Sequence, residues 1–209
     1  MLKALVRGRE SIWEPEVMSA AKRVRGWTFV DIGANTGIYS LALSKNFSRV
    51  HAIEPNPDPA RTLREKAGAN ITIHELAMSN MDGEAMLYLD RTRGRCSGSA
   101  DTILERFNYR PASHPEISKS TWEHEGIMVK TARYDTMFPG PVDLVKIDVE
   151  GAEFLVLEGM GNALKDGNVK NLVVELHDRE RRHELEQLFA KHGYPTKWLG
   201  PDHLFAWTR

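Results

Sequence analysis

The sequence predicts an α/β protein in which helices cover both faces of a mainly parallel β-sheet. Short apolar runs alternate with longer segments of helical spacing, which is typical of strand–helix–strand units. The first apolar run ends in a glycine turn that opens a helix, as in nucleotide-binding α/β units. Polar residues also stand at the carboxyl ends of predicted strands, where such sheets bind ligands. These residues are Asp31, Glu54, Asp148 and His177.

Length and composition indicate one globular domain over residues 1–209. The chain is 41% hydrophobic and 27% charged, and its formal net charge of −1 leaves no basic excess to bind nucleic acid. No apolar run approaches the ~18 residues of a membrane span, and residues 1–10 lack the apolar core of a secretory signal. The single cysteine, Cys96, excludes an internal disulfide. We therefore expect a cytoplasmic protein without nucleic-acid or membrane partners.

Residues 10–25 are expected to form a helix, because apolar residues recur there at roughly helical intervals. Pro15 is tolerated in its first turn, and Gly26 is expected to end it. Residues 1–26 are thus predicted to form an N-terminal helical lid. Two roles remain open for this segment: a cover for the edge of the sheet, or a lid that also closes over a cofactor.

The glycine turn follows a predicted strand over residues 28–32 and has the pattern D-x-G-x-N-x-G. Glycine lets the backbone approach a ligand closely, and the following helix offers unpaired N–H groups. Asp31 precedes the turn, where a carboxylate would repel a pyrophosphate but suit a cationic amino group. The pattern therefore favours S-adenosylmethionine over a dinucleotide. The turn residues expected beside the cofactor are Gly33, Ala34, Asn35 and Gly37.

Glu54 ends the second predicted strand, residues 48–54, and lies 17 positions after Gly37. An acidic residue ~20 positions past the glycine turn is placed to accept hydrogen bonds from both ribose hydroxyls. The alternative is a solvated strand end, but the glycine turn and the prolines that follow favour the ribose role. Pro55 and Asn56 are expected in the same part of the cofactor site.

The third predicted strand covers residues 71–77 and follows a helix over residues 59–69. Its end is expected to lie near the adenine of the cofactor. The contact is made either by the side chain of Glu75 or by the backbone of Leu76 or Ala77.

Residues 90–126 separate two extended pieces, 85–89 and 127–131, and contain few apolar residues. Loops of this length are uncommon inside a compact domain and are usually functional or disordered. The arginines of this stretch suit anionic groups on a substrate. We interpret it either as an acceptor-side insertion that acts as a lid or as a mobile solvated loop.

The fourth main strand, residues 142–148, carries Lys146 and Asp148 on one face, and the alternation continues to Glu150. Polar residues at the end of a central strand are costly unless they face a pocket. Glu153 follows at the start of a helix, where dipole stabilisation is an alternative to a catalytic role.

The fifth strand, residues 171–177, places Glu175 and His177 on one face by the same alternation. A charged helix over residues 178–192 follows. Residues 196–199 and 203–208 are expected to close the sheet as an antiparallel hairpin.

The sequence resembles the FkbM family of class I S-adenosylmethionine-dependent methyltransferases over about residues 12–178. The run I-D-V-E-G-A-E at residues 147–153 is the most specific part of the resemblance, since most class I methyltransferases share the glycine turn. Other segments that carry it are residues 29–37, 52–56, 77–79 with Gly83, 134–135 and 174–175. Tyr134 stands where the family usually has leucine in a strand.

The resemblance implies a seven-stranded Rossmann-like sheet with one antiparallel strand, and mostly O-methylation of sugar or polyketide hydroxyls. It also implies that the glycine turn with Asp31 shapes the amino-acid end of the cofactor site, and that Glu54 binds the ribose. We therefore expect an S-adenosylmethionine-dependent O-methyltransferase acting on a small-molecule or glycan hydroxyl.

Methyl transfer to an alcohol requires alignment of the acceptor and removal of its proton. His177 is the default base because a neutral histidine titrates near pH ~6.5. Lys146 either lowers the pKa of a neighbouring carboxylate or simply pairs with it. No metal is expected, because the carboxylates are explained without one, but an ion held by Asp148, Glu150 and Glu175 is the alternative. The candidate bases are Asp148, Glu150, Glu153 and His177.

Three other functions compete with this prediction. A nucleic-acid base N-methyltransferase usually carries an aromatic residue after the fourth strand to stack a flipped base, whereas this chain has D-V-E-G at residues 148–151. A nicotinamide-dependent oxidoreductase is disfavoured by Asp31 and by the missing middle glycine. A catalytically silent cofactor-binding module is disfavoured by the polar residues at the strand ends.

Overall fold

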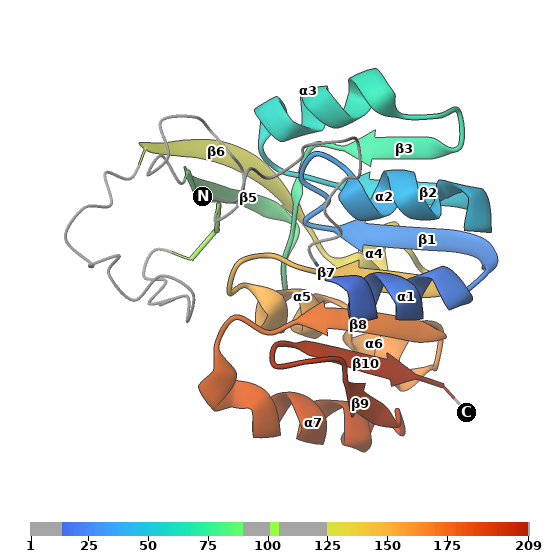
Figure 1. Ribbon diagram of the computed structural model, residues 1–209. Helices are drawn as coiled ribbons and strands as arrows, with labels where there is room; N and C mark the ends of the chain where they lie inside the picture. Colours follow the sequence, from blue (N-terminus) through green and yellow to red (C-terminus); the bar gives the residue numbers. More distant parts are fainter. Residues whose placement is uncertain (1–13, 90–100, 105–124, 209) are drawn as a thin grey trace, which may run out of the picture.

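The computed structural model describes residues 14–89, 101–104 and 125–208 (Figure 1). Residues 1–13 of the expected N-terminal lid lie outside this part, as does most of the expected insertion at residues 90–126. No helix in the described ranges is long and apolar enough to cross a membrane.

The main sheet has seven strands in the order β3-β2-β1-β7-β8-β10-β9. Its strands are parallel except β10, which runs antiparallel to both of its neighbours. This confirms the Rossmann-like sheet with one antiparallel strand. Its strands are β1 (Gly26–Ile32), β2 (Phe47–Ile53), β3 (Ile71–His74), β7 (Leu144–Ile147), β8 (Asn171–Glu175), β9 (Thr196–Trp198) and β10 (His203–Trp207).

Helices cover both faces of this sheet because its central strands are apolar on both sides. Phe29 of β1 packs into one core cluster with residues of α1, α2 and α3, while Val30 packs into another with residues of α5, α6 and α7. Successive side chains of a strand point to opposite faces, so a continuous apolar run fills both cores. The helices are α1 (Pro15–Arg23), α2 (Ile38–Leu43), α3 (Pro57–Lys66), α4 (Tyr134–Met137), α5 (Glu153–Gly159), α6 (Gly161–Lys165) and α7 (Arg182–Lys191).

A second sheet of three strands, in the order β4-β6-β5, extends from the side where the parallel strands end (Figure 1). It consists of β4 (Ala77–Met78), β5 (Gly83–Leu89) and β6 (Glu125–Ala132). The single strand expected over residues 71–77 is therefore wrong, because its last residue belongs to this second sheet. The Leu76 amide donates to the His74 carbonyl at 3.1 Å, and this turn separates β3 from β4.

Other expected boundaries also shift, because long-range pairing overrides local pattern. Gly26 begins β1 instead of ending the first helix, which stops at Arg23. β8 ends at Glu175, so His177 lies beyond the strand. The helix expected over residues 178–192 starts with a 3₁₀ turn (Arg179–Arg181) before α7.

Tyr134 lies at the start of α4 instead of in a strand. Its side chain is fully buried among the apolar residues of the core, beside Phe138. The hydroxyl has no hydrogen-bond partner within the described part of the chain. The departure from leucine therefore places a polar atom in the core, away from the strand ends.

Candidate functional site

The glycine turn is held between β2 and β7 by its backbone. The amides of Gly33 and Ala34 both donate to the Ile53 carbonyl at 3.0 Å. Gly33 has φ +80°, and a Cβ placed on it would lie 1.7 Å from the carbonyl oxygen of Asp148. Only glycine fits this close approach, so the turn and the end of β7 form one continuous edge of the site.

A narrow cavity of about 70 Å³ lies on one side of this edge. Glu54, Leu76 and Ala77 line it, together with Pro55, as the cofactor prediction requires. Gly37, Asn56 and Glu75, which were expected beside the cofactor, line neither this cavity nor the wide one described below. Asn56 instead caps α3 by accepting from the Asp58 amide at 3.0 Å, and the exposed carboxylate of Glu75 pairs with Arg64.

Glu54 is buried, and both of its carboxylate oxygens hold the local backbone in place. One accepts from the Asn35 amide and the other from the Asn56 amide, each at 2.8 Å. Burial raises the pKa of Glu54 to about 7, although the two backbone hydrogen bonds oppose that shift. A carboxylate oxygen accepts more than one hydrogen bond, so Glu54 retains capacity for hydroxyl groups in the cavity.

Asp101 is a lining residue that sequence reasoning did not identify. Its carboxylate accepts from the Asn56 amide side chain at 2.5 Å, and Thr102 joins it in the wall of the narrow cavity. The Thr102 backbone is held against Tyr88 of β5 by a pair of hydrogen bonds of 2.8 and 3.1 Å. Residues 101–104 of the stretch after β5 thus reach the expected cofactor side of the site, whereas the sequence predicted either an acceptor-side lid or a mobile solvated loop.

A wide cavity of about 380 Å³ lies on the other side of the glycine turn. Asp31, Ala34 and Lys146 line it, and Asp31 is buried and accepts from the Ser40 hydroxyl at 2.6 Å. Burial raises the pKa of Asp31, while the Lys146 ammonium opposes this shift. The two cavities share four lining residues: Gly33, Asn35, Asp148 and Glu150.

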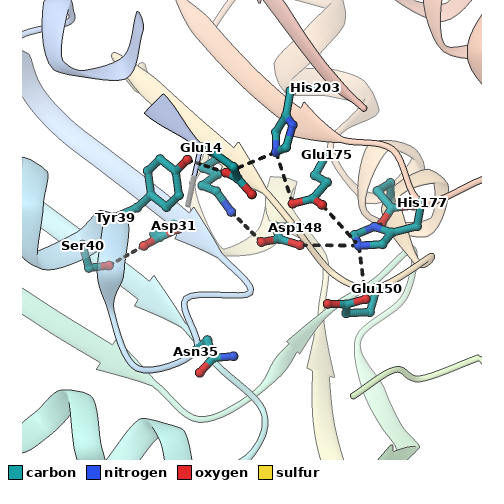
Figure 2. A network of polar contacts seen from close by, with 12 residues as sticks. Glu14, Asp31, Asn35, Tyr39, Ser40, Asp148, Glu150, Glu175, His177 and His203 are labelled. Carbon is teal, nitrogen blue, oxygen red and sulfur yellow. Dashed lines mark hydrogen bonds and ion pairs between the residues drawn. The ribbon is translucent and has the colours of Figure 1, made fainter. Parts of the chain in front are cut away.

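His177 brings the carboxylates at the ends of β7 and β8 together (Figure 2). Its Nε2 lies 3.1 Å from Glu150 Oε2, 3.7 Å from Glu175 Oε1 and 3.9 Å from Asp148 Oδ1. Its Nδ1 lies 2.8 Å from Glu153 Oε1. Three expected catalytic residues, Asp148, Glu150 and Glu153, are therefore neighbours of the imidazole ring of a fourth, which comes from a separate segment of the chain.

The contacts of His177 bear on its expected role as a neutral base. Burial opposes protonation of His177, but the hydrogen bonds to Glu150 and Glu153 raise its pKa well above the ordinary value. The paired carboxylates therefore favour the imidazolium form, which accepts no proton, and the role of His177 as a base stays a prediction.

Glu153 and Lys146 are buried and already engaged. The Glu153 carboxylate also accepts from the Gly151 amide at 2.8 Å, and it lines neither cavity. The Lys146 ammonium lies 2.8 Å from Asp148 Oδ2 and is almost fully buried. Glu153 therefore holds His177 in place, and Lys146 holds Asp148 in place.

Glu150 adopts a left-handed backbone conformation with φ +52°, which is uncommon for a residue other than glycine. The extended alternation expected from Lys146 to Glu150 therefore ends with β7. The turn directs the Glu150 side chain toward His177 and toward the seam, the line of four residues that both cavities share.

Glu14 and His203 extend this polar network and were missed by sequence reasoning. His203 Nε2 lies 3.3 Å from Glu14 Oε2 and 3.2 Å from Glu175 Oε2, and the Tyr39 hydroxyl donates to Glu14 at 2.6 Å (Figure 2). His203 pairs with Glu175 in the β8–β10 register. The hairpin pattern predicted the strand β10. Its first residue, His203, lies beside β8 only because β10 neighbours β8 in the sheet. Glu14, at the start of α1, lines the wide cavity, and the lid role expected for this segment stays a prediction.

Two groups of side chains have the spacing of metal ligands within the described ranges. One consists of Asp148, Glu175 and His177, and the other of Glu14, Glu175 and His203. Carboxylate oxygens and imidazole nitrogens are suitable ligands for divalent cations.

Comparisons with known proteins agree with this geometry. The family described as "Methyltransferase FkbM domain" matches residues 31–196. The chain is 31% identical over 153 residues to the hexuronic acid methyltransferase AglP of Haloferax volcanii, covering 70% of this chain and 54% of that protein. It is 28% identical over 161 residues to Methyltransferase 1 of Beauveria bassiana, covering 71% of this chain and 64% of that protein. The chain thus spans only part of the length of both relatives.

Solved structures share the fold at low sequence identity. An FkbM methyltransferase from Methylobacillus flagellatus superposes with a TM-score of 0.58 at 16% identity, covering 87% of this chain and 43% of that chain. An rRNA methylase from Streptococcus thermophilus superposes with a TM-score of 0.52 at 9% identity, covering 92% of this chain and 95% of that chain. Together with the family match, the sheet order and the strand-end site assign this chain to the FkbM methyltransferase family.

Proposed function

We propose that the protein binds S-adenosylmethionine and transfers its methyl group to a hydroxyl. One observation carries this proposal: two cavities of different character meet at Gly33, Asn35, Asp148 and Glu150. The narrow cavity, with the buried carboxylate of Glu54, suits an adenosine. The wide cavity, which begins at Asp31, has room for the methionine end and an acceptor. The reactive sulfonium would then lie at the seam between them.

The residues at the seam suit an in-line displacement. As the acceptor oxygen bonds to the methyl carbon, the carbon–sulfur bond breaks and its electron pair remains on sulfur. The acceptor proton passes to a basic group beside the seam, and Asp148 and Glu150 both line it. Alignment supplies a large part of the rate, because the sulfonium is already a good leaving group.

A sugar or polyketide hydroxyl is the acceptor class that we favour. The relative named as a hexuronic acid methyltransferase supports a carbohydrate acceptor. The likeness to an rRNA methylase concerns the fold alone, and the D-V-E-G run at residues 148–151 has no aromatic residue to stack a flipped base. Screening monosaccharides and macrolactones for formation of S-adenosylhomocysteine tests this choice. Methyl transfer to nucleic-acid bases, with none to hydroxyl compounds, would contradict it.

Glu54→Ala is expected to weaken S-adenosylhomocysteine binding by roughly 1–3 kcal/mol, or about 5- to 150-fold, because it removes a charge-assisted hydrogen-bond acceptor. Calorimetry on the folded variant measures this loss. Glu75→Ala is the matched control, since that carboxylate is exposed and lines neither cavity. Equal affinity in Glu54→Ala and wild type, or tighter binding of NADH than of S-adenosylhomocysteine, would refute the cofactor assignment.

Without cofactor, Glu54 is expected to make the free energy of unfolding fall as pH rises from 4.5 to about 7. Its pKa is raised on folding, so in this window the folded state holds a proton that the unfolded chain has lost. The stabilisation is complete below the window and is lost as pH rises through about 7. Between about pH 5 and pH 8 the free energy of unfolding should therefore fall less for Glu54→Gln than for wild type. The difference between the two falls should be about 1–3 kcal/mol. Urea denaturation at both pH values measures the difference, and identical slopes would contradict it.

A further inference from the structure

We propose that Asp148, Glu175 and His177 form a binding site for one divalent cation of the Mg²⁺/Mn²⁺ type. Their ligand atoms all lie within 4.8 Å of one another. Two atoms bound to one such ion at about 2.1 Å lie between ~3.0 and ~4.2 Å apart, depending on the angle. The separations of His177 Nε2 from Asp148 Oδ1 and from Glu175 Oε1, 3.9 and 3.7 Å, fall in this range.

Each of these three side chains is held by a separate partner through its other polar atom. Asp148 Oδ2 accepts from the Lys146 ammonium at 2.8 Å, and His177 Nδ1 lies 2.8 Å from Glu153 Oε1. Glu175 Oε2 lies 3.2 Å from His203 Nε2. Metal-ligating histidines almost always donate their second ring N–H to a carboxylate or carbonyl, and ligating carboxylates are themselves hydrogen-bonded. The outer contacts of all three residues follow this pattern.

The tautomer of His177 suits a ligand at Nε2. The Glu153 carboxylate accepts hydrogen bonds, so Nδ1 is the nitrogen that donates to it. Nε2 faces three carboxylates, those of Asp148, Glu150 and Glu175, all within 3.9 Å. In the ion-free structure Nε2 is paired with Glu150. A cation bound at Nε2 would take the place of a proton on that nitrogen and would leave the Glu150 carboxylate beside the ion, where it could accept the proton of a water or an acceptor hydroxyl.

The site is open to a substrate because Asp148 and Glu175 both line the wide cavity. An ion there can orient an acceptor hydroxyl and lower its pKa. This catalytic use rests on the proposed function, whereas ion binding itself does not. The proposed ligands differ from the alternative considered from the sequence, which combined Asp148 and Glu175 with Glu150 instead of His177. The proposal also departs from our expectation from the sequence that the site holds no metal.

Binding of Mn²⁺ to chelator-treated protein, measured without and with S-adenosylhomocysteine, tests the proposal. We expect one Mn²⁺ per chain by calorimetry, displaced by Mg²⁺. Asp148→Asn and His177→Gln should each weaken binding at least about tenfold, and Glu153→Gln by about 10- to 100-fold through the outer contact. Glu14→Gln is the matched control, because it alters only the neighbouring group of Glu14, Glu175 and His203. Glu158→Gln controls for removal of an exposed carboxylate.

Paramagnetic broadening by Mn²⁺ in the wild-type protein needs no variant. The ring signals of His177 should broaden before those of the exposed His183. No Mn²⁺ binding at millimolar concentration, or binding that His177→Gln leaves intact, would overturn the proposal. If Glu14→Gln abolished Mn²⁺ binding, the ion would belong to the group of Glu14, Glu175 and His203, and the proposal would also be overturned. If the protein still binds S-adenosylhomocysteine in any of these cases, only the ion site is refuted, and the proposed cofactor site is unaffected.

Discussion

Replacing His177 by alanine is expected to lower the rate of methyl transfer by about 10²–10⁴-fold while leaving S-adenosylhomocysteine affinity nearly unchanged. His177 contacts Glu150 and Glu153 and lies within 3.9 Å of Asp148, so its loss disturbs the carboxylates proposed to lie beside the acceptor. It lines neither cavity, so the proposed cofactor contacts should remain. Turnover with an acceptor from the hydroxyl screen and calorimetry with S-adenosylhomocysteine measure the two effects.

Three variants make this experiment specific. His177→Gln is less disruptive to folding, because an amide still reaches part of the network. His183→Ala removes an exposed histidine of α7 and should change neither quantity. Asp148→Ala should lower both turnover and cofactor affinity, because Asp148 lines both cavities. Full activity in a folded His177→Ala protein would mean that acceptor activation does not pass through this ring.

Gly33→Ala is expected to destabilise the protein by about 3 kcal/mol or more and to abolish cofactor binding. The left-handed conformation costs a residue with a side chain roughly 1–2 kcal/mol. The added Cβ would also lie 1.7 Å from the Asp148 carbonyl oxygen, so the turn or the end of β7 must move. Either movement displaces residues that line both cavities. Urea denaturation and calorimetry with S-adenosylhomocysteine measure the two losses.

Gly140→Ala is the matched control for this substitution. A Cβ at Gly140 meets no heavy atom within 4 Å, and its backbone lies outside the left-handed region. We expect its stability to stay within about 0.5 kcal/mol of wild type. If Gly33→Ala matched this control, the close packing of the turn on β7 would be wrong.

The sequence alone determined the parallel core of the fold and the edge at which the site lies. Short runs rich in apolar, strand-forming residues identify β1, β2, β7 and β8 without any knowledge of their neighbours. Because parallel strands end at one edge, four residues were predicted to lie together: Asp31, Glu54, Asp148 and His177. Asp31 lines the wide cavity, Glu54 lines the narrow one and Asp148 lines both. His177 lines neither cavity but lies 3.9 Å from Asp148. Their detailed roles in binding and catalysis stay predictions.

Only the tertiary structure decided which polar groups touch one another. The pairing of His177 with Glu153 depends on β7 lying beside β8, and that of His203 with Glu175 depends on β10 closing against β8. Local periodicity cannot encode such contacts, because they depend on strand order and not on spacing along the chain. The same holds for Asp101, which a pair of backbone hydrogen bonds at Thr102 brings to the narrow cavity. Burial and these contacts also shift the pKa of His177 away from its ordinary value, and spacing along the chain gives no sign of that shift.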